Sequence, residues 1–183
     1  MLAASLASLS LVATLVVPTV TTQPVSVDAP PPPRLTAERW IVYDANDEVV
    51  LASWNANDEA PMASVTKVMT AIVVLENASL EETVVIPASA TGARGSTAGL
   101  VAGEQWTVGD LLIAMMVRSG NDAAIALAGH VGGTVGTFVD LMNAKARELG
   151  MLNTRFENPN GLDAENHYST ANDLLTLTIA SQD

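Results

Sequence analysis

The stretch PMASVTKVMTAIVVL, residues 61–75, is apolar nearly all round and predicts a central, buried helix from about Ser64 to Glu76. It contains Lys67, one of only two lysines in the chain, three positions after Ser64. Residues three apart share one face of a helix, so the serine hydroxyl and the lysine amine can meet near the first turn.

The position of Lys67 disfavours a charged ammonium group. The N-terminal end of a helix carries partial positive charge, which costs a nearby cation about 0.3–1 kcal/mol. Apolar neighbours predict burial, which also lowers the pKa of a lysine. A neutral amine beside a serine hydroxyl is a general base beside a nucleophile. The alternative is a lysine whose amine reaches water while Ser64 only caps the helix.

A second polar element lies within MVRSGNDAAIALA, residues 116–128. Ser119 and Asn121 stand at a break between two predicted helices, where a hydroxyl and an amide can point into a cleft. Taken alone, this is an ordinary helix-to-helix turn with Asn121 or Asp122 as N-cap. Combined with the first pair, it supplies a second hydroxyl that can pass a proton to a leaving amine.

The remaining patterns predict an α+β organisation. Residues 39–54 indicate a hairpin with two apolar faces, which we expect helices to cover on both sides. A short strand is expected within 80–87, a loop over 88–106 and another over 153–169. Further helices are expected from Thr107 to 118, over 122–130, over 135–149, and from Ser169 or Thr170 to the end of the chain.

Composition excludes several kinds of chemistry. The net charge of −12 argues against nucleic acid and against an anionic membrane surface as partners. The chain has no cysteine and only two histidines, His130 and His167, so we predict no metal site and no cofactor. Acidic residues such as Glu81, Glu82 and Asp110 are interpreted as solvated surface or caps.

The N-terminal segment differs from the rest. Residues 1–22 begin with an uncharged, apolar and small-residue run that predicts an export signal, although no basic residue precedes it. Residues 23–36 form a proline-rich linker, and the folded domain is expected over 37–183. The alternative for the first run is a buried N-terminal helix.

These motifs resemble the D-alanyl-D-alanine carboxypeptidases, the low-molecular-mass penicillin-binding proteins of serine peptidase family S11. S-V-T-K at 64–67 resembles the family's first box, S-x-x-K, and S-G-N at 119–121 its second. WIVYDANDEVVLASWNAN resembles its opening hairpin, and LGMLNTRFENPNGLDAENHYSTANDL its downstream stretch. The resemblance runs from about Arg39 to the chain's end. It implies a β-lactamase/DD-peptidase-like fold, with an antiparallel sheet flanked by helices plus a helical lobe.

The resemblance also implies a function, removal of the terminal D-alanine from peptidoglycan stem peptides. Ser64 would form the acyl-enzyme and its backbone N–H half of the oxyanion hole, Lys67 would be the base, and Ser119 would relay a proton. Asn121 would bind the substrate backbone and help fix the lysine. β-Lactam antibiotics would acylate the same serine. The protein would be exported to the cell envelope and act in peptidoglycan biosynthesis and cell shape. Peripheral association with the outer face of the cytoplasmic membrane stays open.

One family feature is missing from this sequence. No K-T-G box follows, since the only later lysine is Lys145 in the helical segment NAKARELG. The family's closing strands are missing as well, so the chain is interpreted as an N-terminal portion of the family domain. We expect these residues alone to be weakly stable and impaired in turnover, and efficient cleavage of a D-alanyl-D-alanine peptide would refute this.

Two alternatives remain. A class A serine β-lactamase needs a glutamate in an E-x-x-L-N stretch, and the nearest match, ELGMLN from Glu148, has one residue too many. A non-catalytic wall-binding or regulatory protein would keep the cleft without the chemistry. The absent third box favours this reading, whereas the intact Ser64 and Lys67 oppose it.

Overall fold

The computed structural model describes residues 35–182, so the predicted export segment and most of the linker lie outside the described residues. In chain order the elements are β1 (Trp40–Asp44), β2 (Val49–Trp54), the 3₁₀ turn η1 (Ala63–Val65), α1 (Thr66–Asn77), β3 (Thr83–Val85), β4 (Gln105–Thr107), α2 (Val108–Arg118), α3 (Asn121–Gly132), α4 (Val135–Glu148) and α5 (Ala171–Ala180).

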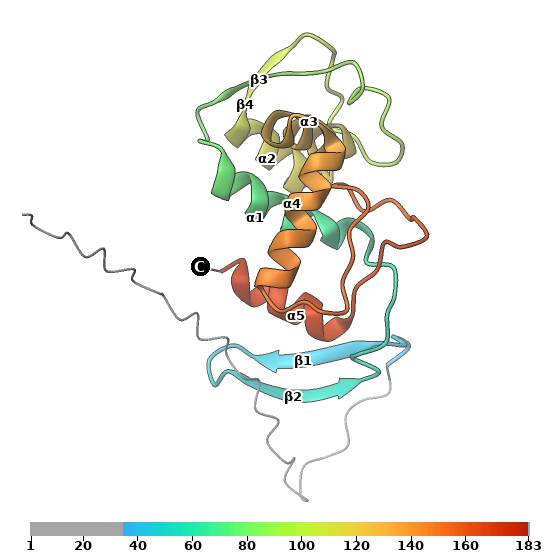
Figure 1. Cartoon of the computed structure of the whole chain (residues 1–183). Coiled ribbons are helices and arrows are strands. Elements are labelled where there is room, and N and C mark those ends of the chain that lie inside the picture. The colour runs from blue at the N-terminus through green and yellow to red at the C-terminus, as the bar shows by residue number, and fades with distance from the viewer. Residues whose placement is uncertain (1–34, 183) are drawn as a thin grey trace, which may run out of the picture.

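Helices α1 to α4 form one lobe around a continuous apolar core. α1 packs against each of the other three helices and, at its other side, against α5 (Figure 1). Large side chains from every helix of the lobe are fully buried, among them Met69, Val73, Leu111, Met115, Leu127, Phe138 and Met142. The prediction of a central buried helix is confirmed, although Leu75 near its end is exposed.

Two small antiparallel sheets lie at opposite ends of the molecule, β1–β2 beside α5 and β3–β4 beyond α2 and α3 (Figure 1). The predicted hairpin is confirmed, with a register shift between Val42 and Tyr43. The expectation that helices cover both of its faces is wrong for the described residues. α5 packs on one face, whereas Val42 and Leu51 on the other are 44% and 50% exposed.

Capping side chains set the helix starts. Thr107, Thr134 and Thr170 each accept a hydrogen bond from a backbone N–H three positions on, which confirms the predicted starts of α2, α4 and α5. α3 starts at Asn121 with no side-chain cap, so the reading of Asn121 or Asp122 as N-cap is wrong. Both side chains bond instead to the segment 94–100.

Other boundaries depart modestly from expectation. The predicted loop over 88–106 ends in strand β4, which pairs with β3. A three-residue strand offers too little periodicity to be recognised from sequence alone. α5 ends at Ala180 with Ser181 as its C-cap, so the expectation that it runs to the end of the chain is wrong.

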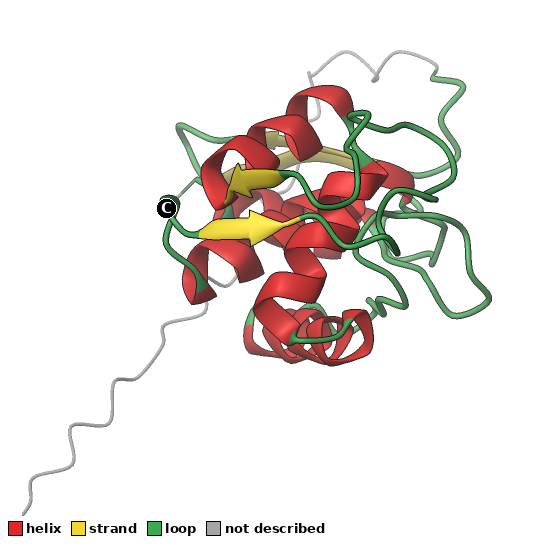
Figure 2. Ribbon diagram, turned by 90° about the horizontal axis from the view of Figure 1, so that it is seen from above, coloured by secondary structure: helices red, strands yellow, loops and turns green. Residues whose placement is uncertain are grey.

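The long connections gather on one side of the molecule. Residues 86–104 and 149–170 both extend on the right in Figure 1, where the N-terminal end of α1 also lies. Figure 2 shows from above that helices make up most of the body, with the loops concentrated along one edge. Among residues 35–182, no single helix is long and apolar enough to cross a membrane. α3 and α4 would reach that length only as a pair bent by 86°.

Candidate active site

Ser64 lies in a tight turn immediately before α1. η1 carries it, and the preceding Ala63 has a positive φ of 47°. Gly161, at φ 85°, packs directly on this turn, and a Cβ at Gly161 would overlap the carbonyl oxygen of Ala63. Only glycine fits so close an approach in this conformation. The nucleophile candidate is therefore held by a loop almost a hundred residues further along the chain.

Lys67 occupies the first turn of α1, as predicted. Its Nζ lies 3.2 Å from Ser64 Oγ and donates to the carbonyl oxygen of Asn160 at 2.6 Å. The residue is only 2% exposed, and no carboxylate of the described residues forms an ion pair with it. Burial lowers the pKa of Lys67 below its ordinary value of 10.5. A larger fraction of neutral amine at a given pH is the result.

Ser119 reaches the same point from the end of α2. It adopts a left-handed conformation, φ 53° and ψ 36°, at the C-cap of that helix. Its hydroxyl donates to Ser64 Oγ at 3.0 Å. The structure thus brings together Ser64, Lys67 and Ser119, two hydroxyls and one amine.

Asn121 is placed differently from expectation. The side chain is nearly buried, and its Nδ2 donates to the carbonyl oxygen of Arg94 at 2.6 Å. It makes no hydrogen bond with Lys67, so the prediction that Asn121 fixes the lysine is not met. Asn160 fulfils that role with its backbone oxygen. A contact between Asn121 and substrate stays a prediction.

Sequence reasoning missed the loop that holds the start of α1. Besides the Lys67 bond to Asn160, Thr70 Oγ1 donates to the carbonyl oxygen of Pro159 at 2.7 Å. The asparagine, proline and glycine residues of this loop signal a turn, which a sequence reading can find. Backbone carbonyls as partners of α1 leave no trace in the sequence.

His167 supports the turn that carries Ser64 through a hydrogen bond to Thr66. Its Nδ1 accepts the N–H of Glu157 at 3.0 Å, so the proton sits on Nε2, which donates to Thr66 Oγ1 at 2.8 Å. Thr66 in turn donates to the Ala63 carbonyl oxygen at 2.8 Å. Burial lowers the pKa of His167 against the opposing charges of Glu157 and Asp163. A neutral histidine therefore braces the turn that carries Ser64.

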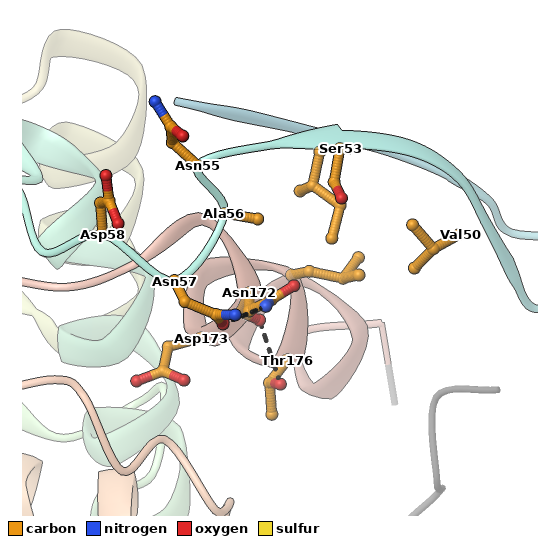
Figure 3. A pocket seen from close by; sticks show the side chains of 11 residues that line it. Val50, Ser53, Asn55, Ala56, Asn57, Asp58, Asn172, Asp173 and Thr176 are labelled. Atoms are coloured by element: carbon orange, nitrogen blue, oxygen red, sulfur yellow. Dashed lines mark hydrogen bonds between the residues drawn. The ribbon is translucent and has the colours of Figure 1, made fainter. Parts of the chain in front are cut away.

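Two other features lie away from these residues. A cavity of about 550 Å³ opens between the hairpin and α5, and its lining includes Ser53, Asn57, Asn172 and Thr176 but none of the four predicted site residues (Figure 3). Within residues 35–182, no group of three His, Cys, Asp or Glu side chains is arranged to hold a metal ion.

Fold and site together define a class, α+β proteins in which a serine directly before a central helix meets a lysine in the first turn of that helix. The family profile of the D-alanyl-D-alanine carboxypeptidases, Peptidase_S11, matches residues 25–183. This chain belongs to that family.

Individual relatives agree with this assignment. D-alanyl-D-alanine carboxypeptidase DacC of Escherichia coli (strain K12) is 40% identical over 156 residues, which cover 79% of this chain and 39% of the relative. A D-alanyl-D-alanine endopeptidase of Pseudomonas aeruginosa is 40% identical over 167 residues, 86% of this chain and 54% of the relative. The chain thus spans about two fifths of the length of the first of these.

The solved structures confirm the expected fold. The crystal structure of a D-alanyl-D-alanine carboxypeptidase from Mycobacterium tuberculosis H37Rv superposes with a TM-score of 0.81 at 37% identity. The match covers 86% of this chain and 60% of that one. The predicted family and the predicted β-lactamase/DD-peptidase-like fold are both confirmed.

Proposed function

We propose that this protein is a serine-type D-Ala-D-Ala carboxypeptidase that acts on peptidoglycan stem peptides through an acyl-enzyme on Ser64. The observation that carries the proposal is the meeting of Ser64 Oγ with Lys67 Nζ at 3.2 Å and with Ser119 Oγ at 3.0 Å. A nucleophile, a base of lowered pKa and a second hydroxyl are the groups that acyl transfer requires. Membership of the carboxypeptidase family supports the substrate class.

In the proposed reaction Ser64 Oγ attacks the carbonyl carbon between the last two D-alanines, and neutral Lys67 takes the hydroxyl proton. The C–N bond then breaks, and the proton that Lys67 accepted passes through Ser119 to the departing amine, which leaves Lys67 neutral and Ser119 protonated. The N–H of Ser64 has no acceptor among the described residues, which leaves it free for the developing oxyanion. Water afterwards attacks the ester, releases the shortened stem and returns the proton to Ser64.

Acylation by a fluorescent penicillin tests the proposal, since a β-lactam would react with the same serine. Wild-type protein should gain one covalent label, located on Ser64 by peptide mass analysis, and Ser64→Ala should gain none. Ser53→Ala, in a serine of the hairpin outside the site, is the matched control and should label normally. A label on another residue, or equal labelling of Ser64→Ala, would refute the proposal.

A second candidate reaction is cleavage of a peptide cross-link by the same acyl-enzyme. It is favoured by the relative named D-alanyl-D-alanine endopeptidase, which matches at the same 40% identity as the carboxypeptidase DacC. The chemistry at Ser64 is unchanged, and only the leaving group is larger. Product analysis with a D-alanyl-D-alanine pentapeptide and a cross-linked dimer distinguishes the two.

The structure gives no support to the β-lactamase alternative. Glu148 bonds to Lys145, which also pairs with Glu76. Glu76 lies nine positions after Lys67, or about 14 Å further along α1. Glu148 therefore lies near the end of α1 that is remote from Ser64 and is not in position to activate a deacylating water. The acyl-enzyme formed with a β-lactam should consequently be hydrolysed slowly. Rapid hydrolysis of the antibiotic would favour the β-lactamase, and failure to label would favour the non-catalytic relative.

The cellular setting is part of the proposal. Residues 1–22 are proposed as an export segment and 23–36 as a linker to the domain that begins near 37. On this basis the protein is proposed to act in the cell envelope, where peptidoglycan lies, and to associate peripherally with the outer face of the cytoplasmic membrane. Mass analysis of the N-terminus of protein recovered from the envelope fraction would test both the cleavage and the location.

A further inference from the structure

A single buried carboxylate holds the segment 94–100 against the turn that carries Ser119. Asp122 is 2% exposed, and its two oxygens accept the backbone N–H groups of Ala98 at 2.8 Å, Gly99 at 2.9 Å and Leu100 at 3.1 Å. Its Oδ1 also accepts the N–H of Ala123 at 2.9 Å. Charge-assisted bonds of this kind are about twice as strong as neutral ones.

The neighbouring Asn121 also hydrogen-bonds to the segment 94–100. Its backbone N–H donates to the Ser96 carbonyl oxygen at 2.8 Å and its side-chain amide to that of Arg94 at 2.6 Å. Asn121 and Asp122 therefore both hydrogen-bond to residues 94–100, a segment that we call the strap. The strap also approaches the loop that holds Lys67, because Gly95 lies close to Leu162.

The Ser119–Asn121 turn is tightly packed against its surroundings. A Cβ at Gly120 would lie 3.0 Å from Asp122 Oδ1, 3.2 Å from the Ala114 oxygen and 3.2 Å from Ala98 Cβ. Ser119, directly before it, has a positive φ of 53°, which a residue with a side chain rarely adopts. This conformation persists because the surroundings over-determine it.

We propose that Asp122 is a positioning residue for acylation of Ser64, because its bonds to the strap fix the Ser119–Asn121 turn and thereby the place of Ser119 Oγ. The inference rests on the proposed function. Asp122 touches none of the reacting atoms and acts through the turn.

Asp122→Asn in the full chain tests this, because an amide offers one acceptor oxygen and turns its N–H₂ group toward backbone donors. The matched control is Asp173→Asn. Asp173 is likewise nearly buried and accepts a backbone N–H, from Asn153 at 2.8 Å, and the hydroxyl of Thr154 at 2.7 Å. These partners lie outside the site. Three quantities are measured: the penicillin acylation rate, resolved into binding and chemical steps, hydrogen exchange of the amides at 98–100, and the thermal midpoint.

Both variants should lower the thermal midpoint. Asp122→Asn alone should speed exchange at 98–100 and slow the chemical step of acylation at least about tenfold, with penicillin binding little changed. Asp173→Asn should acylate within about twofold of wild type. The inference is overturned if Asp122→Asn acylates at the wild-type rate, or if Asp173→Asn loses as much of the acylation rate as Asp122→Asn. Either result leaves the proposed function standing. An unlabelled wild type overturns the proposed function, and the inference with it.

A second pair of variants covers the case in which Asp122→Asn does not fold. In Gly120→Ala the added Cβ would crowd Asp122 and Ala98 without removing a charge. This variant should slow acylation severalfold. Gly129→Ala on α3 meets nothing within 4 Å and should not slow it. Wild-type rates in both would overturn the inference.

Discussion

The only two lysines of this chain lie near opposite ends of α1, in contrasting surroundings. Lys67, in the first turn, contacts a hydroxyl and a backbone carbonyl, and its pKa is lowered by burial. Lys145 reaches the last turn of α1 from α4 and pairs with Glu76 and Glu148 at 2.8 and 2.7 Å. Burial alone would lower the pKa of Lys145, but the two carboxylates outweigh burial and raise it.

The difference teaches that the neighbours, not burial by itself, decide what a lysine does. Two carboxylates stabilise an ammonium group and keep it as a structural cation. A hydroxyl and a carbonyl add no negative charge, so desolvation prevails and the amine becomes available as a base. The first environment links α1 to α4, and the second supplies the proposed chemistry.

The largest effect is expected from exchanging the two lysines for alanine in turn. Lys67→Ala should slow penicillin acylation of Ser64 by about a hundred- to ten-thousandfold, since a general base is lost. Lys145→Ala should leave the rate within about twofold. Stopped-flow or gel-based labelling kinetics would measure both. Labelling of Lys67→Ala at the wild-type rate would show that Lys67 is not the general base.

A second contrast uses two glycines of positive φ, Gly161 beside the Ser64 turn and Gly150 after α4. Gly161→Ala should cost about 3 kcal/mol or more of unfolding free energy, because both its φ of 85° and its contact with Ala63 reject a Cβ. Gly150, at φ 79° after α4, meets nothing within 4 Å, so its replacement should cost only about 1 kcal/mol. Urea titration would measure both, and equal costs would show that contact with the Ser64 turn is unimportant.

The pH dependence should also differ between the two lysines. Acylation should rise about tenfold per pH unit while Lys67 is mostly protonated and level off above its lowered pKa, below 10.5. The raised pKa of Lys145 means that its contribution to stability is fully present below 10.5 and is lost as pH rises through the higher folded-state value. A rate profile that levels off only above 10.5 would contradict the lowered pKa of Lys67.

The smallest expected effect concerns stability. Lys145→Met should lower the unfolding free energy by about 1 kcal/mol or less, because Glu76 and Glu148 are about half exposed and water screens the pairs. High salt should reduce the difference in unfolding free energy between the variant and wild type. A thermal unfolding series in sodium chloride would measure this, and a loss of several kcal/mol would show that the cluster is more than a surface link.

Much of the fold could be read from local sequence. The capping pair Thr107 and Asp110, and Gly150 after α4, set boundaries through bonds between near neighbours, which is why those expectations hold. The cover of the hairpin could not be read in this way. Apolar side chains on both strand faces show what could be buried, and the described structure leaves Val42 and Leu51 exposed.

The sequence by itself determined the pairing of Ser64 with Lys67, because a spacing of three on a helix fixes which side chains are neighbours. The sequence also offered Ser119 as a second hydroxyl, but only the tertiary structure decided its contact with Ser64, 55 residues away, and the contact of Lys67 with the carbonyl of Asn160, 93 residues away. A backbone oxygen is the same in every residue, so no pattern of side chains announces it. The lowered pKa of Lys67 belongs to the same category, since burial without a carboxylate is a property of the assembled fold.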